Sequence, residues 1–125
     1  MNEFDLIQGY FNWKLNDASI ELGVGDDAAI FNLDPGHQLI TSTDTLVEGI
    51  HFFKNASPID IAYKSLAVNL SDIAAMGGVA KCYTLSLTLP KLDKDWLEQF
   101  STSLKESSER FRVNLIGGDT TRGPL

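Results

Sequence analysis

The sequence predicts an α+β fold with a mixed or antiparallel sheet and helices packed on one of its faces. Three observations lead to this prediction. Segments with apolar residues at every third or fourth position alternate with segments that have a strand-like pattern. Turns rich in glycine, proline and aspartate separate these segments. The 125 residues are 43% hydrophobic and contain no internal repeat, which indicates one domain with a substantial core.

The first part of the chain predicts a helix followed by a hairpin. Residues 3–15 place apolar side chains at three- and four-residue spacing, typical of a short amphipathic helix. A glycine- and aspartate-rich turn follows at residues 23–27. Two strand-like runs, residues 28–33 and 38–43, then flank the tight-turn sequence at residues 34–36. We therefore expect these two runs to pair as a β-hairpin.

The middle of the chain predicts a long helix and a strand. Ser57 is a suitable N-cap, Pro58 suits the first helical position, and the two glycines at 77–78 can end the helix. Residues 83–89 then alternate between apolar and hydroxyl-bearing side chains. This alternation predicts a strand with one buried face.

The last part of the chain predicts a second helix and a short strand. Asp93 can cap the helix, whose apolar residues share one face. An apolar run at residues 113–116 predicts a strand that leads into a turn at residues 117–119. The chain ends at Leu125, shortly after this turn and with no further predicted element. A finished domain more often ends on an exposed, dispensable tail. We therefore expect the chain to be the front portion of a longer protein.

Charge and cysteine content exclude several classes of function. The formal net charge of −7 leaves no basic excess for a nucleic-acid backbone, so no nucleic-acid partner is expected. No positively charged leader opens the chain, and no apolar run approaches the length of a membrane span, so no membrane association is expected. Cys82 is the only cysteine, which excludes an internal disulfide and a cysteine-based zinc site. A cytoplasmic protein is the expected setting.

Acidic residues cluster in four short stretches at or near the ends of predicted elements. The stretches are residues 25–27, 42–45, 69–72 and 117–120. A single stretch of this kind is usually a turn or a helix cap. Four together, rich in carboxylate and hydroxyl oxygens, point to hard cations such as Mg²⁺. In the first stretch, Asp26 can shape the turn by accepting a backbone N–H, which leaves Asp27 as the metal ligand.

The long helix carries a polar stripe of Ser65, Asn69 and Asp72 on an otherwise apolar, predominantly buried surface. This stripe is either a solvated seam, with Lys64 available for pairing, or a row that directs Asp72 into a metal cavity. We favour the metal cavity, because a buried carboxylate needs a partner. His51, between two apolar residues, is more typical of a packed core histidine than of a ligand.

The four acidic stretches belong to longer motifs that resemble a known family. The motifs are residues 23–29 (GVGDDAA), 42–52 (STDTLVEGIHF), 67–78 (AVNLSDIAAMGG) and 116–125 (IGGDTTRGPL). Their order and content resemble the thiamine-monophosphate kinases, within the aminoimidazole ribonucleotide synthetase-like superfamily. The resemblance implies that residues 1–125 form the N-terminal ATP- and magnesium-binding α+β domain, that a C-terminal domain is absent from this chain, and that the protein is a homodimer.

The resemblance also implies an activity and a set of ligands. The reaction is direct, in-line, magnesium-assisted transfer of a phosphoryl group from ATP to thiamine monophosphate, giving thiamine diphosphate. The implied magnesium ligands are Asp27, Ser42, Thr43, Asp44, Asp72 and Asp119. Gly118 and Asp119 are implied to border ATP, and His51 to bind the thiamine monophosphate.

No residue is predicted to act as a nucleophile or a general base, because the acceptor is a phosphate oxygen that already carries charge. Two alternatives stay open at this point. One is another ATP-using enzyme of the same superfamily. The other is a non-catalytic metal- or nucleotide-binding module that acts by dimerising.

Overall fold

The structure is a computed structural model that describes residues 3–15 and 17–123. It contains three α-helices, one π-helix (η1) and four strands within these residues, which confirms the α+β class. In chain order the elements are α1 (Glu3–Leu6), η1 (Ile7–Phe11), β1 (Ile20–Leu22), β2 (Ile30–Phe31), α2 (Pro58–Ala75), β3 (Cys82–Leu89), α3 (Lys94–Phe111) and β4 (Asn114–Arg122). No helix in the described part of the chain is both long and apolar enough to cross a membrane.

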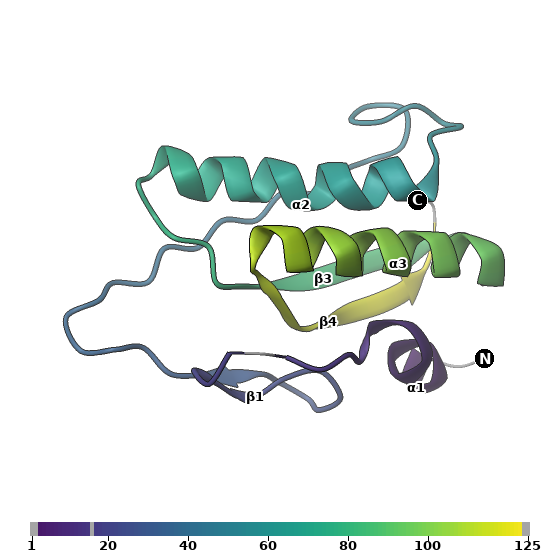
Figure 1. The fold of residues 1–125 in the computed structure, drawn as a ribbon. Helices are drawn as coiled ribbons and strands as arrows, with labels where there is room; N and C mark the ends of the chain where they lie inside the picture. The colour runs from purple at the N-terminus through teal and green to yellow at the C-terminus, as the bar shows by residue number, and fades with distance from the viewer. Residues whose placement is uncertain (1–2, 16, 124–125) are drawn as a thin grey trace.

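The largest unit consists of α2, α3 and the β3–β4 pair. β3 and β4 are parallel, and α3 connects them, as parallel strands require a crossover. Figure 1 shows α2 and α3 side by side along this strand pair. The predicted caps are both present, since the Ser57 hydroxyl accepts from the Asp60 amide and the Asp93 carboxylate accepts from the Trp96 amide, each at 3.2 Å.

The core lies between these helices and the strand pair. β3 shows the predicted alternation: Leu87 and Leu89 are buried, whereas Thr84 and Ser86 on the other face are exposed. The other buried apolar side chains of the core come from the N-terminal α1 and η1, from α2, α3 and β4, and from the residue before β4. Those outside the N-terminal segment include Ile61, Ala62, Leu66, Leu97, Phe100, Leu104, Val113 and Leu115. Burial of a leucine or phenylalanine side chain contributes about 1.5–3 kcal/mol, so this cluster is the main source of stability.

The N-terminal helix is shorter than the predicted residues 3–15. α1 passes directly into η1, which ends at Phe11, and Asn12 leaves helical geometry with φ −97° and ψ 82°. The π-turn contains Gly9, whose flexible backbone favours such a local distortion. Leu6 and Phe11 are buried, and the Phe11 ring meets the edge of Phe100 at a centroid distance of 6.2 Å. The side chain of Phe4 lies outside the described residues.

The predicted hairpin between residues 28–33 and 38–43 is wrong. β2, within the first run, pairs antiparallel with β1, in the register Ile20↔Phe31 and Leu22↔Ile30. Residues 38–43 form no strand, and all of them are exposed. The turn that closes the hairpin is therefore residues 23–27, not residues 34–36. Among the described residues, no strand pairs with residues 38–43.

β4 is longer than predicted and includes residues 117–119, which were expected to form a turn. The reason is β3, which offers β4 a partner over eight residue pairs, from Cys82↔Asn114 to Leu89↔Arg122. The register shifts where Tyr83 pairs with Leu115 but Thr84 pairs with Gly117, which leaves one extra residue in β4. Strand pairing therefore outweighs the local turn preference of two glycines.

Tyr83 gives this unit a pH-dependent stability. Its hydroxyl is 2.6 Å from Ser108 Oγ, and burial raises the pKa of Tyr83 to about 12, against about 10 in an unfolded chain. Because the folded pKa is the higher one, the contribution is complete below pH 10 and is lost as the pH rises towards 12. We expect a loss of up to about 2–3 kcal/mol over this range.

The measurement is urea unfolding between pH 8 and pH 12. Tyr83→Phe should cost about 1 kcal/mol at pH 8 through the lost hydrogen bond, and should flatten the alkaline decline. Tyr63→Phe, at the half-exposed Tyr63, is the matched control and should leave that decline intact. An equally steep decline in wild type and Tyr83→Phe would contradict the assignment.

Candidate functional site

Two of the four acidic stretches meet at one cavity. The cavity has a volume of about 330 Å³ and lies between the 23–27 turn, η1 and the strands β3 and β4. Its apolar side consists of Ile7, Phe11, Val24, Leu85 and Leu115, and its polar side of Gly25, Asp26, Asp27, Gly117, Gly118, Asp119 and Thr120. The structure therefore brings the predicted ligands Asp27 and Asp119 to the same cavity, which Gly118, the predicted neighbour of ATP, also lines.

The turn that carries Asp27 is shaped by Gly25 and Asp26, as predicted for Asp26. Gly25 adopts φ +114°, a conformation that side chains disfavour, and the Asp26 carboxylate accepts the Asp27 amide at 2.8 Å. Asp26 therefore shapes the turn. Asp27 and Asp119 are exposed, and neither carboxylate has a side-chain partner within residues 3–15 and 17–123. Both are thus available to an external cation.

The other two stretches meet at the C-terminal half of α2. Ser42 Oγ donates to Asp72 Oδ2 at 3.4 Å, and the Asp44 carboxyl group is hydrogen-bonded to that of Asp72. The hydrogen bond with Asp72 is the main cause that raises the pKa of Asp44, followed by desolvation and the negative charge of Asp72, while His51 lowers it. Two carboxyl groups this close need a shared proton or a cation between them.

The expectation that α2 is predominantly buried is wrong, because only Ile61, Ala62 and Leu66 are buried. Asp72 is exposed and reaches Ser42 and Asp44 at the surface of the helix. The rest of the polar stripe bonds to its own helix. Ser65 Oγ donates to the Ile61 carbonyl oxygen at 2.7 Å, and Asn69 Nδ2 donates to the Ser65 carbonyl oxygen at 2.8 Å. Asp72 is therefore the member of the stripe that is directed towards another segment.

The interpretation of His51 as a packed core histidine is also wrong. His51 is exposed, and its Nδ1 accepts the Val47 amide at 2.9 Å. Lys64 of α2 donates from Nζ to the His51 carbonyl oxygen. Sequence reasoning considered Lys64 only as a partner for Asp72. Nothing local indicates the contact with His51, because the two residues lie in different elements and meet only through the tertiary fold.

The predicted magnesium ligands thus form two groups: Asp27 with Asp119, and Ser42 with Asp44 and Asp72. Thr43 is exposed and lies between the two residues of the second group that contact Asp72. Within the described residues, no three histidine, cysteine, aspartate or glutamate side chains approach closely enough to hold a metal ion. The all-oxygen donors and the Asp44–Asp72 pair nevertheless suit Mg²⁺, which binds few carboxylates and keeps waters and phosphate oxygens. The ligand set stays a prediction.

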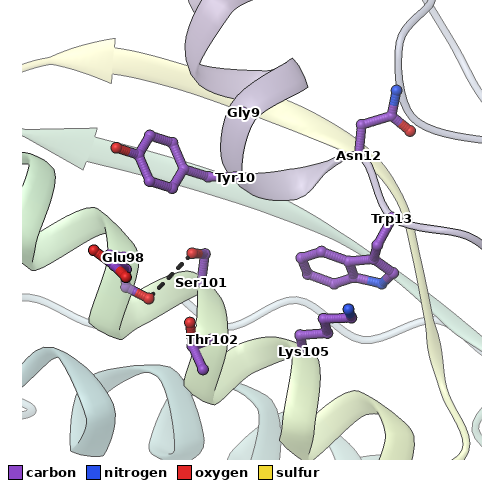
Figure 2. A pocket seen from close by; sticks show the side chains of 8 residues that line it. All are labelled: Gly9, Tyr10, Asn12, Trp13, Glu98, Ser101, Thr102 and Lys105. Carbon is purple, nitrogen blue, oxygen red and sulfur yellow. Dashed lines mark hydrogen bonds between the residues drawn. The ribbon is translucent and has the colours of Figure 1, made fainter.

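A second cavity, of about 440 Å³, lies between η1 and α3, away from the predicted ligands. Figure 2 shows its lining, with Tyr10 and Trp13 from the N-terminal segment opposite Glu98, Ser101, Thr102 and Lys105 of α3. Ser101 Oγ donates to the Glu98 carbonyl oxygen, so this hydroxyl is engaged within its own helix. None of the residues predicted to bind metal, ATP or substrate lines this cavity.

Comparisons with known sequences and with solved structures identify the same family. The thiamine-monophosphate kinase of Haemophilus influenzae is 49% identical over 126 residues, covering 100% of this chain and 38% of that relative. The chain therefore spans well under half the length of the relative. The crystal structure of thiamine-monophosphate kinase from Stenotrophomonas maltophilia K279a superimposes with a TM-score of 0.80 and 46% identity, over 86% of this chain and 34% of the other.

A further similar structure is that of a ligand complex. AaThiL complexed with AMPPCP and TMP has a TM-score of 0.61 and 33% identity, over 64% of this chain and 26% of the other. The family model for AIR synthase related protein, N-terminal domain, matches residues 25–125, which include all the predicted ligands and both cavity-lining strands. The chain therefore belongs to the AIR synthase related family and carries its N-terminal domain.

Proposed function

We propose that this protein phosphorylates thiamine monophosphate with ATP to give thiamine diphosphate, and that it acts in the cytoplasm. Residues 1–125 are its N-terminal ATP- and magnesium-binding domain, and a C-terminal domain completes the enzyme. The observation that carries the proposal is the contact of Asp44 with Asp72 beside Ser42. It places two carboxylates and a hydroxyl close together, and a bound cation would offset the repulsion between the two carboxylates. The names of the relatives and the ligands of the AaThiL complex supply the substrates.

The reaction makes particular demands on the protein. The bond between the γ-phosphorus and its bridging oxygen breaks, and a phosphate oxygen of thiamine monophosphate forms the new bond in line with it. The acceptor oxygen is already charged, so the protein needs no strong base. Its tasks are to align two phosphate groups and to offset their repulsion.

The candidate residues suit these two tasks. Asp27 and Asp119 at the cavity, and Ser42, Thr43, Asp44 and Asp72 at α2, would hold Mg²⁺. When bound, Mg²⁺ neutralises phosphate charge and orients the phosphate oxygens. Gly118 and Asp119 border the cavity in which ATP would lie, and apolar residues form the rest of its lining. His51 presents an exposed imidazole for the acceptor phosphate.

The homodimer belongs to the same proposal. Large apolar side chains are exposed along the segment that follows β2, and they are Leu33, Leu39, Ile40, Val47, Ile50 and Phe53. Large apolar side chains that are exposed along one segment are typical of an interaction surface. β3 and β4 also have one hydrogen-bonded neighbour each among the described strands, which leaves strand edges for a partner.

The test is an assay of the full-length gene product with ATP, Mg²⁺ and thiamine monophosphate, with thiamine diphosphate and ADP quantified by chromatography. We expect the two products in equal amounts, and no product when EDTA removes the divalent cation. Thiamine without a phosphate group is the matched control and should not be phosphorylated. ADP release without thiamine diphosphate would indicate another ATP-using enzyme of this family. Binding of ATP without any turnover would indicate a non-catalytic module.

A further inference from the structure

The segment that carries His51 is a closed turn. The amides of Ile50 and His51 both donate to the Val47 carbonyl oxygen, at 3.1 and 2.9 Å. The imidazole completes the turn, because its Nδ1 accepts the Val47 amide at 2.9 Å. A ring nitrogen that accepts a hydrogen bond carries no proton, so the neutral ring carries its proton on Nε2. The turn therefore presents His51 as a hydrogen-bond donor through Nε2.

Two contacts attach this turn to the rest of the domain. Phe52 packs against the core, and Lys64 of α2 donates from Nζ to the His51 carbonyl oxygen. The neighbouring side chains contribute no comparable attachment, since Ile50 is 75% exposed and Phe53 is 85% exposed. Lys64 is engaged in no ion pair with an acidic residue of the described chain, so its ammonium group is committed to the backbone of the turn.

We propose that Lys64 is a positioning residue for the acceptor phosphate. Phe52 packs against the core, and the bond from Lys64 to the His51 carbonyl oxygen holds the His51 end of the turn against α2. Lys64 thereby directs the Nε2–H of His51 towards the phosphate of the substrate. A charge-assisted bond is stronger than a neutral one, which suits an exposed attachment. This inference rests on the proposed function for its substrate, but not for the geometry of the turn.

The test compares Lys64→Met, which keeps the aliphatic stem, with Lys64→Arg, which keeps a charged donor. In the full-length protein, we expect Lys64→Met to raise the KM for thiamine monophosphate about tenfold and to leave the KM for ATP within about twofold. Lys64→Arg should have a KM for thiamine monophosphate close to that of wild type. Lys91→Met, at an exposed lysine that follows β3, is the matched control and should resemble wild type.

A second measurement needs no substrate. The ¹⁵N NMR shifts of the His51 ring, assigned by their absence in His51→Gln, report which ring nitrogen carries the proton. We expect the Nε2–H form in the free wild-type protein. In Lys64→Met we expect a mixture of forms, because a turn released from α2 opens and partly loses the bond from the Val47 amide to Nδ1. An unchanged His51 spectrum in Lys64→Met would overturn the inference, even if the KM rises, because Lys64 would then contact the substrate directly. If the wild type does not phosphorylate thiamine monophosphate, the proposed function fails, and the spectra alone decide the role of Lys64.

Discussion

Asp44→Asn is expected to lower the turnover of the full-length protein about 10³-fold without lowering its melting temperature. The loss of activity has the size typical of removing one preorganised electrostatic contact from an active site. The retained stability follows from the contact between Asp44 and Asp72, two acids whose close approach is unfavourable without a proton or a cation. An amide removes one of the two charges, so the melting temperature measured in EDTA should be equal to or higher than that of wild type.

The same variant should bind Mg²⁺ more weakly. In wild type, Mg²⁺ added with a non-hydrolysable ATP analogue should raise the melting temperature, and this rise should shrink in Asp44→Asn. Asp34→Asn is the matched control, because it removes the same charge from an exposed turn outside the site. Undiminished turnover in Asp44→Asn would exclude Asp44 as a magnesium ligand. Equal losses in both variants would attribute the effect to overall charge.

Gly118→Ala is expected to destabilise the protein by about 3 kcal/mol or more. Gly118 has φ +152°, and a Cβ atom at this position would lie 1.8 Å from the Leu85 carbonyl oxygen of β3. Because that oxygen belongs to the backbone of a paired strand, the clash cannot be relieved by a side-chain movement. β3 and β4 would have to separate locally, and the loss corresponds to a fall of about 10 °C in the melting temperature.

The neighbouring glycine is the control. A Cβ atom at Gly117 would meet no atom within 4 Å, so Gly117→Ala should keep the fold. Both glycines line the cavity, but only Gly118 is required by the packing of the strands. Urea unfolding of the two variants measures the difference. Equal stabilities would show that β3 and β4 are not in the register Leu85↔Gly118.

The parts of the fold that could be predicted are those with local causes. α2 and α3 begin at the predicted caps, Ser57 and Asp93, since each cap bonds to a backbone amide only three residues away. The alternation in β3 likewise follows from neighbouring residues. The hairpin and the extent of β4 depend on which strand each segment meets, and no short stretch of sequence contains that information. β1, with three residues, also offers too short a pattern to detect.

The candidate site likewise has features with local causes, which could be predicted, and features that depend on the tertiary fold. The types of residue, and the stretches in which they occur, could be predicted because oxygen-rich turns have a recognisable composition. The grouping of Asp27 with Asp119, and of Asp44 with Asp72, could not be predicted, because it results from the tertiary fold. The contact between Lys64 and the His51 carbonyl oxygen is of the same kind. Such contacts join residues that lie in different elements.

The layout of the chain also has a consequence for the order in which the domain folds. α2, β3, α3 and β4 follow one another within residues 58–122 and contain most of the core. Residues 32–57 contain no helix or strand and attach to α2 through Ser42, Asp44 and His51. The core can therefore form before this segment docks, because its contacts are closer in sequence. Substitutions such as Lys64→Met would then accelerate unfolding more than they slow folding. Docking of this segment would then be the last folding step, and it would bring Ser42, Asp44 and His51 to α2.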